Sequence, residues 1–387
     1  MNVFILSHAC VTPINQAFFA EVERRTGWNL TIVAPARWAS EYGSRVLERW
    51  PDYQGALVPV PVWLSGNVPL HVYRTFFRDL LRTHAPDVVF VHHEPYGLAT
   101  AQLYAANAAV RRCPIGFFTW QNIPKRYPAP FRQLEQWVYG QSAFACSGSE
   151  SAADVLRQKG YTGPIDALPA SLDLDLYRPY DGAPALKREL GVEEDVPLIG
   201  FMGRIVEEKG LGTLVQALDQ LREQAWQVAF IGGGAYEGEL RRMLTQMGLI
   251  DRCTWRAYVP HTEAPRYLSA FDVLVLPSET RPNWKEQFGR VIIEAMACGT
   301  PVLGSDSGEI PHLIEATQGG LTFAEGDAHA LAARLQSLLT DPALGHRLAE
   351  HGRRAVQERF SLAAVAEAFA GTLRRAARPS TTPIQVH

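Results

Sequence analysis

Two basic residues in the second half of the chain have the types and the spacing that binding of an anionic ligand requires. Arg204 and Lys209 lie in the segment GRIVEEKG, directly after a short apolar run that predicts a buried strand. A guanidinium can bind phosphate oxygens through two parallel hydrogen bonds, whereas an ammonium acts as a point charge. A solvated charged turn is the alternative, but the place of the segment after a strand favours a ligand-binding role.

Two acidic residues follow at a spacing of eight positions, Glu286 and Glu294, in the segment EQFGRVIIEAMACGTP. After Gly289 this segment predicts a helix that is apolar on nearly every face, ends at Gly299 and is therefore buried. A carboxylate inside such a helix needs a partner, because burying an unpaired charge is very costly. The N-terminus of a helix also suits a phosphate, because it carries partial positive charge and free N–H groups. A core helix with one satisfied glutamate is the structural alternative.

The elements that must position these residues alternate between short β-rich runs and helical stretches. In the first half, strands are predicted at residues 3–6, 30–33, 87–91, 115–119, 143–146 and 165–168. Helices are predicted between them at residues 15–25 (with Asn15 as N-cap), 68–84, 98–109, 129–139 and 149–159. The alternation restarts with strands at residues 197–202, 226–232, 254–258, 273–277 and 301–305, and a helical region spans 328–377. This order predicts an α/β protein with two doubly wound parallel sheets that face each other across a cleft.

The length of 387 residues also favours two domains over a single core. A looser segment, rich in proline and glycine, separates the two halves. We predict an N-terminal domain at 1–170, a linker at 171–195, a second domain at 196–358, a C-terminal helix at 359–377 and a flexible tail at 378–387.

Composition narrows the classes of protein. The net charge of −3 does not suggest a nucleic-acid partner, for which a strongly basic face is expected. Five scattered cysteines, never spaced as CxxC, favour a reducing compartment over a disulfide framework or a zinc site. No apolar run reaches the roughly 18 residues of a membrane span, and the N-terminus lacks a basic leader. We therefore expect a cytoplasmic protein.

The segments GRIVEEKG, FIGGG, YLSAFDVLVLPS and EQFGRVIIEAMACGTPV resemble, in order and spacing, the retaining glycosyltransferase family 4. The first half agrees through its strand–helix rhythm and the segment LPASLDLDLYRP. The resemblance implies the GT-B fold, with two Rossmann-like domains and a C-terminal helix that returns to the first domain. It also implies a UDP- or GDP-sugar donor held by the second domain, and a saccharide or lipid-linked acceptor held by the first.

The resemblance assigns roles to individual residues. Arg204 and Lys209 would neutralise the diphosphate, Glu286 would bind hydroxyls of the donor sugar, and Glu294 would bind the ribose. These cations and the helix N-terminus would stabilise the leaving group without a metal ion or a cofactor. Further donor contacts are implied at Gly203, Val259, Phe288, Gly289 and Arg290.

The first half departs from the family pattern at two places. The family often has a Gly-Gly loop after the first strand, where this chain reads HACVTPINQAFF, and a histidine where this chain has Gln121. We also find no third ligand at a spacing that would make His92 and His93 a metal site. From their places after strands and at a helix start, the predicted cleft residues are Asn15, Gln16, His93, Glu94, Gln121 and Asn122.

We therefore predict a metal-independent retaining hexosyltransferase, with polysaccharide or glycolipid assembly as the setting that the resemblance implies. A sugar-nucleotide-binding protein without turnover and a GT-B-fold nucleotide-sugar epimerase are the alternatives. Arg74, Arg78 and Arg82 recur every four residues on one helix face. That stripe is either a solvated face or a peripheral contact with the inner face of a membrane.

Overall fold

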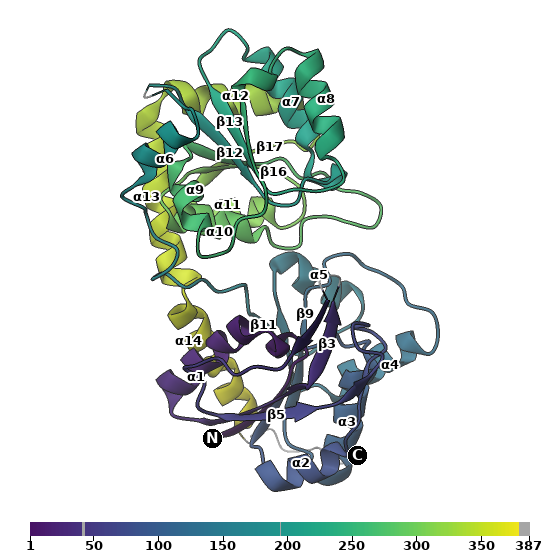
Figure 1. Ribbon diagram of the computed structural model, residues 1–387. Helices are drawn as coiled ribbons and strands as arrows, with labels where there is room; N and C mark the ends of the chain where they lie inside the picture. The colour runs from purple at the N-terminus through teal and green to yellow at the C-terminus, as the bar shows by residue number, and fades with distance from the viewer. Residues whose placement is uncertain (41–42, 194, 379–387) are drawn as a thin grey trace. The chain divides into compact units, whose positions relative to one another are not determined.

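A computed structural model describes residues 1–40, 43–193 and 195–378 of the chain, which forms two compact units (Figure 1). The first unit contains residues 1–169 together with the C-terminal segment from Leu362, and the second contains residues 170–361. Each unit is built on its own parallel sheet with helices, so the predicted α/β class and the GT-B fold are confirmed. In the described part of the chain, no helix combines the length and apolarity needed to cross a bilayer.

The sheet of the first unit has seven parallel strands in the order β11-β10-β9-β8-β1-β2-β5. Their bounds are β1 Asn2–Leu6, β2 Asn29–Pro35, β5 Ala56–Val60, β8 Val88–Val91, β9 Ile115–Thr119, β10 Phe144–Ser147 and β11 Ile165–Ala167. Short antiparallel pairs lie outside this sheet: β3 Arg37–Ser40 with β4 Gly43–Val46, and β6 Val62–Trp63 with β7 Val72–Tyr73.

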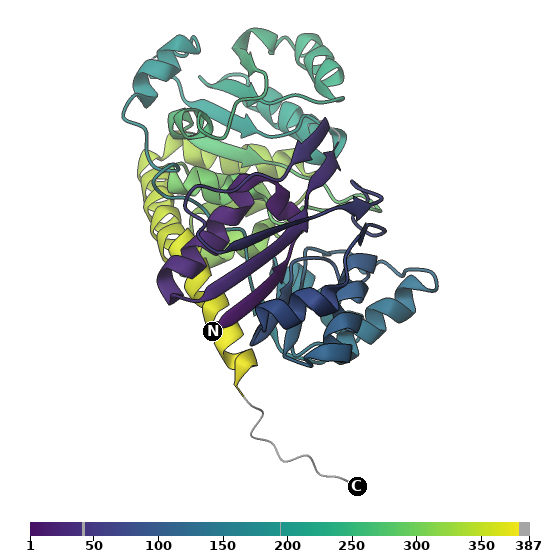
Figure 2. The same cartoon turned by 60° about the horizontal axis from the view of Figure 1, so that its bottom comes forward.

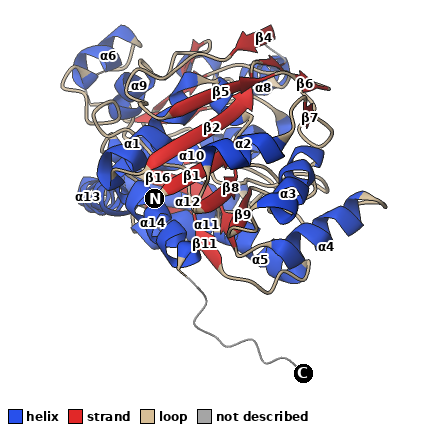
Figure 3. Ribbon diagram, turned by 90° about the horizontal axis from the view of Figure 1, so that it is seen from below, coloured by secondary structure: helices blue, strands red, loops and turns tan. Residues whose placement is uncertain are grey.

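Side chains alternate along the strands of this sheet and build one core on each face. Val3 and Ile5 of β1 pack with α1 (Ala17–Thr26) and α14 (Leu362–Ala377). Phe4 and Leu6 pack on the opposite side, with α2 (Phe77–His84) and α3 (Leu98–Val110). Figure 3 shows these helices on the two faces of the sheet.

The C-terminal helix α14 completes the first of these two cores. The ring of Phe369 lies 5.6 Å from that of Phe18 and 6.4 Å from that of Phe19, both on α1. Figure 2 shows α14, in yellow, running beside α1. The remaining helices of the unit are α4 Phe131–Gln141 and α5 Glu150–Gln158.

The second unit has six parallel strands in the order β14-β13-β12-β15-β16-β17. Their bounds are β12 Leu198–Met202, β13 Gln227–Ile231, β14 Cys253–Arg256, β15 Val273–Leu276, β16 Val302–Ser305 and β17 Gly320–Phe323. Its helices are α6 Ala183–Glu189, α7 Leu211–Gln220, α8 Glu237–Gln246, α9 Ala264–Ala270, α10 Arg290–Ala297, α11 Ile310–Thr317, α12 Ala328–Thr340 and α13 Pro342–Arg359. Short 3-10 helices in the two units are Ala9–Val11, Pro13–Gln16, Glu207–Lys209 and Ile250–Arg252.

Several predicted boundaries were wrong. The helix predicted at 68–84 begins only at Phe77, because residues 72–73 form strand β7. Asn15 is not an N-cap: it lies in a 3-10 turn, and α1 begins at Ala17. The predicted linker at 171–195 belongs to the second unit and contains α6. Most of the tail predicted at 378–387 lies outside the described residues.

Strands β5 and β17 were missed, and both lie at edges of their sheets. Strand β5 contains Pro59, which an edge strand tolerates because one side of it needs no hydrogen bonds from the backbone. Strand β17 begins with Gly320, whose added Cβ would meet the carbonyl oxygen of Val302 at 2.1 Å. Pro59 and Gly320 therefore explain why the sequence did not predict these two strands, and the close approach of Val302 requires the glycine.

Candidate active site

The charged segments of the second unit rise from its two central strands, β12 and β15. The chain continues from β12 toward β13 on one side, whereas β16 and β17 lie on the other side of β15. This reversal of strand order is the point at which ligands bind in doubly wound sheets, outside the carboxyl ends of the strands. The segment with Arg204 and Lys209 follows β12, and the segment with Glu286 follows β15.

Lys209 and Glu286 form an ion pair, with 2.5 Å between the ammonium nitrogen and a carboxylate oxygen. The hydroxyl of Ser278 donates to the same oxygen at 2.9 Å. The ammonium also lies 5.2 Å from the ring centroid of Trp284, which is a cation–π distance. The sequence predicted both charged residues. It did not predict their pairing, because they lie 77 positions apart, and it did not predict the contacts of Ser278 and Trp284.

Arg204 is an exposed cation of the site. Its side chain is 64% exposed, and its guanidinium lies 3.8 Å from the carboxylate of Glu208. Such an exposed pair contributes little to stability, so the guanidinium is available to a ligand. Arg204 and Lys209 therefore differ in kind: one is held in place and one can close on a bound anion.

These residues line a hollow of about 310 Å³ in the second unit. Of the residues predicted from the sequence, Gly203, Arg204, Lys209, Glu286, Gly289 and Arg290 lie on its wall. A larger hollow, of about 430 Å³, lies in the first unit among residues at the amino ends of its strands, such as Val3 and Leu30. We favour the smaller one, because ligands of doubly wound sheets bind at the carboxyl ends.

Gly289 is the residue at which the loop after β15 joins helix α10. It is the N-cap residue of α10 and has a left-handed backbone with φ of 75°. An added Cβ there would also lie 3.0 Å from Ile292 and 3.2 Å from Leu276. The next backbone N–H groups of the helix therefore begin at the wall of the hollow. The ring of Phe288, the residue before Gly289, is buried and lies 6.2 Å from that of Phe360.

Glu294 is buried inside α10, as expected, and its carboxylate has partners within the protein. Its carboxylate lies 3.1 Å from the guanidinium of Arg290, one helical turn earlier. Burial raises the pKa of Glu294, while Arg290, His261 and the hydroxyl of Tyr177 oppose that rise. These protein groups compensate the buried charge, and the binding of a ribose by Glu294 stays a prediction.

Three of the predicted donor residues do not line the hollow, and Val259 is one of them. It follows β14 at the edge of the sheet, and among the described residues it is not part of the wall. Glu294 and Phe288 are likewise absent from the described wall.

In the first unit, Gln16 is a structural residue. Its amide group is fully buried and donates to the carbonyl oxygens of Cys10 at 2.8 Å and Glu48 at 2.7 Å. It also accepts from the backbone N–H of Trp50 at 2.9 Å. Asn15 is exposed and donates to the carbonyl of Ala9. The interpretation of these two residues as acceptor ligands is therefore not supported by their contacts.

Gln121 is fixed by two neighbours rather than free for a ligand. Its amide donates to the hydroxyl of Tyr127 at 3.0 Å, and its oxygen accepts from the ammonium of Lys159 at 3.0 Å. The same ammonium is paired with the buried Glu135. Asn122, the next residue, is buried. This polar cluster holds the loop after β9 in one conformation.

The three residues after β8 have three different environments. The ring of His92 lies 3.0 Å from the hydroxyl of Ser7. His93 turns the other way, toward His8. Glu94 accepts from the Thr119 hydroxyl at 2.6 Å and from the backbone N–H of Trp120, while burial raises its pKa to about 7. Glu94 thereby joins the loops after β8 and β9.

The chain is thus a doubly wound α/β protein, and its second sheet has a hollow lined by cationic side chains at the point where the strand order reverses. Residues 183–355 match the family described as glycosyl transferases, group 1. The matched residues lie within the second unit.

Relatives and solved structures agree with this assignment. The chain is 31% identical to 2-deoxystreptamine glucosyltransferase of Streptomyces kanamyceticus, over 54% of each protein. It is 34% identical to D-inositol 3-phosphate glycosyltransferase of Xylanimonas cellulosilytica, over 63% of this chain and 60% of the relative. The matches thus span only about half to three fifths of these relatives.

The fold is also that of a glycosyltransferase from Rickettsia africae, with a TM-score of 0.76, 15% identity and coverage of 98% of this chain and 99% of the other. HepE from Anabaena, solved in complex with UDP, is similar with a TM-score of 0.75, 17% identity and coverage of 97% and 100%.

Proposed function

We propose that the protein is a glycosyltransferase that moves a sugar from a nucleotide-diphosphate donor to a saccharide or lipid-linked acceptor. The observation that carries this proposal is the hollow at the switch point of the second sheet, where Arg204, Lys209 and the N-terminus of α10 meet. An anion with two phosphates matches this set, because a guanidinium, an ammonium and free backbone N–H groups each bind phosphate oxygens.

The same groups would serve the chemistry of transfer. When the bond between the anomeric carbon and the diphosphate breaks, negative charge grows on the leaving phosphate oxygen. Donors fixed in advance around that oxygen stabilise it most. Lys209 is such a donor, because its ammonium is held by the ring of Trp284 and by Glu286, whose carboxylate accepts from Ser278. We propose that transfer proceeds with retention, that the leaving phosphate takes the acceptor proton, and that no divalent ion is needed at the diphosphate.

The identity of the donor is a further part of the proposal. HepE was solved with UDP and with UDP-glucose, and a relative from Mycolicibacterium smegmatis is named a GDP-mannose-dependent mannosyltransferase. These names support UDP- or GDP-sugars as the donor class here. The acceptor would be a hydroxyl of a saccharide or of a lipid-linked saccharide.

A panel of nucleotide sugars tests the proposal. One UDP- or GDP-sugar should raise the Tm of the protein and be hydrolysed slowly without acceptor, because binding to the folded state stabilises it. Product analysis by NMR should show the anomeric configuration of the donor, and added Mg²⁺ or Mn²⁺ should not raise the rate. Binding without hydrolysis or transfer for every donor and acceptor would instead support a sugar-nucleotide-binding protein. No shift with any donor would contradict the proposed function.

An exposed hairpin of the first unit supports peripheral contact with a membrane. Trp63 and Phe76 are 60% and 81% exposed, and Leu64 lies between them in the chain at 60%. The guanidinium of Arg74 lies 5.5 Å from the ring centroid of Trp63. Aromatic side chains beside arginine are typical of surfaces that rest on anionic lipid.

Replacing both Trp63 and Phe76 by serine should weaken binding to vesicles that contain anionic phospholipid, measured by co-sedimentation. The loss should be severalfold and should be larger at high salt, where the arginines contribute less. Ile14→Ser, at a residue that is 52% exposed elsewhere on the unit, is the matched control. Equal sedimentation of all three proteins would show that this hairpin is solvated.

A further inference from the structure

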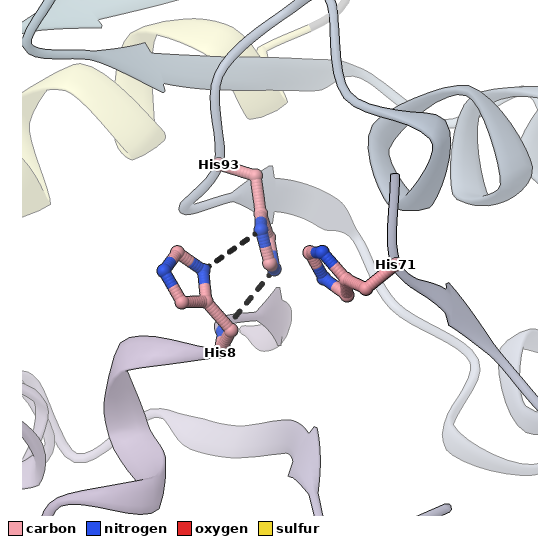
Figure 4. Close-up of side chains that lie close together, drawn as sticks. All are labelled: His8, His71 and His93. Carbon is pink, nitrogen blue, oxygen red and sulfur yellow. Dashed lines mark hydrogen bonds between the residues drawn. The ribbon is translucent and has the colours of Figure 1, made fainter. Parts of the chain in front are cut away.

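Three histidines from three separate loops of the first unit converge on one point (Figure 4). His8 follows β1, His71 precedes β7 and His93 follows β8. One ring nitrogen from each lies within 4.8 Å of those from the other two. His71 and His93 are buried, and His8 is half-buried. The sequence analysis found no third ligand beside His93, because the residues that join it lie 85 and 22 positions away.

The contacts of His71 settle which of its nitrogens carries the proton. Its Nδ1 lies 2.9 Å from the carbonyl oxygen of Val68 and 3.2 Å from that of Asn67. Carbonyl oxygens only accept, so Nδ1 carries the proton and Nε2 presents a lone pair. This Nε2 is buried and has no hydrogen-bond partner among the described residues. A ring nitrogen that donates to a backbone carbonyl is the usual orientation of a metal-binding histidine.

His8 and His93 supply the other nitrogens. The backbone N–H of His8 donates to Nε2 of His93 at 3.2 Å, so the proton of a neutral His93 is on Nδ1. That Nδ1 lies 3.0 Å from Nδ1 of His8, to which it donates. The proton of His93 therefore lies between the two Nδ1 atoms, and Nε2 of His71 has no donor among the described residues.

Burial keeps these rings uncharged. Loss of solvent, followed by repulsion from His71 and His92, lowers the pKa of His8 to about 3. Burial is also the main reason that the pKa values of His93 and His71 lie below the usual range. The neutral imidazole is the form that binds metal ions. A cluster of three neutral, inward-facing imidazoles therefore has lone pairs to offer and no charge to repel a cation.

We propose that His8, His71 and His93 bind one divalent transition-metal ion of the zinc class. Among the described residues the group holds imidazoles and no carboxylate or thiolate, a ligand set that suits Zn²⁺, Cu²⁺ or Ni²⁺ over Mg²⁺ or Ca²⁺. Zn–N bonds of about 2.0–2.1 Å at tetrahedral angles place ligand nitrogens roughly 3.3 Å apart. The observed Nδ1 separation of 3.0 Å and the limit of 4.8 Å lie on either side of that value.

Binding requires a small rearrangement of His93. The ring gives up its two hydrogen bonds with His8, one of its nitrogens binds the ion, and its single proton ends on the other nitrogen. Since all three rings are already neutral, no proton is released to solvent. The ion would join the loop after β1, the hairpin of β6 and β7, and the loop after β8, and a tetrahedral ion would keep its fourth position for water or another small ligand.

Metal binding is tested on the full chain without an added histidine tag, after treatment with a chelator. Titration with Zn²⁺ against a chromophoric chelator should show one site per chain. Loss of an outer supporting contact weakens a metal site by about 10–100-fold. His71→Gln and His93→Gln each remove a ligand and should weaken the site by at least that factor. His351→Gln, at an exposed histidine of α13, is the matched control and should leave the site unchanged.

A second measurement reports where the ion binds. The ring centroid of Trp38 lies 5.0 Å from that of His8 and 4.9 Å from that of His71. Titration with Co²⁺ or Cu²⁺ should therefore quench part of the tryptophan fluorescence at one equivalent, and Trp38→Phe should remove that part. Circular dichroism of each variant before titration shows that it is folded.

Two results would overturn the proposal. One is the absence of saturable Zn²⁺ binding to the folded chain. The other is equal Zn²⁺ affinity in His71→Gln, His93→Gln and His351→Gln, which would place the ion on surface residues. Neither result bears on nucleotide-sugar binding, which is measured separately and in the other unit.

Discussion

Replacing Lys209 by alanine is expected to lower kcat for sugar transfer by about 10²–10³-fold, the effect of removing one fixed donor from a developing oxyanion. Arg204→Ala should lower the rate as well. Its exposed guanidinium must first close on the donor, so part of its effect should lie in KM. Steady-state and single-turnover kinetics with the donor found in the panel separate these contributions.

Two variants keep the first result interpretable. Lys285→Ala removes a neighbouring ammonium that is not on the described wall of the hollow, and it should keep a normal rate. Lys209→Ala also leaves the buried carboxylate of Glu286 without its ammonium, which is destabilising in itself. Lys209→Met combined with Glu286→Gln removes both charges and should recover the Tm but not kcat. Near-normal rates in both Arg204→Ala and Lys209→Ala would refute the diphosphate site.

Glu294→Gln is expected to raise the Kd for the nucleotide-sugar donor by about 10–100-fold. A hydrogen bond to a charged group contributes about 1.5–3 kcal/mol, and about 1.4 kcal/mol corresponds to tenfold in affinity. The wild-type protein should bind the 2′-deoxy analogue more weakly than the ribose donor, and the variant should lose this preference. Isothermal titration with the two nucleotides measures both effects.

The protein partners of Glu294 supply the control for this experiment. Arg290→Gln removes the guanidinium that lies 3.1 Å from the carboxylate but keeps the carboxylate itself. It should therefore retain the preference for ribose. If Glu294→Gln keeps the full preference, the carboxylate serves only the ion pair with Arg290 and the core of α10.

The sequence was sufficient for features that depend on neighbouring residues. The segment GRIVEEKG and the spacing of Glu286 and Glu294 carry local signals, namely a turn after a strand and a helix with one acid. The parallel sheets follow from the alternation of strands and helices. Most of the donor residues predicted in this way line the hollow, whereas Val259, Phe288 and Glu294 do not.

Features that depend on distant residues could not be predicted. The ion pair of Lys209 and Glu286 exists because β12 and β15 are neighbours, which no local pattern reveals. Gln16 has the same appearance in the sequence as a polar cleft residue, yet its amide satisfies backbone groups from two segments. The three histidines meet only because β1 and β8 are adjacent and a hairpin brings His71 beside them.

The place of α14 has a consequence for the synthesis of the protein. The first unit is discontinuous in sequence: it is interrupted after residue 169 and resumes at Leu362. Chains are made from the N-terminus, and domains generally fold as they emerge from the ribosome. Here the whole second unit is synthesised before Phe369, which completes the core around Phe18 and Phe19. The first unit to be synthesised is therefore the last to be completed, and until then the apolar side chains that α14 covers lack that cover.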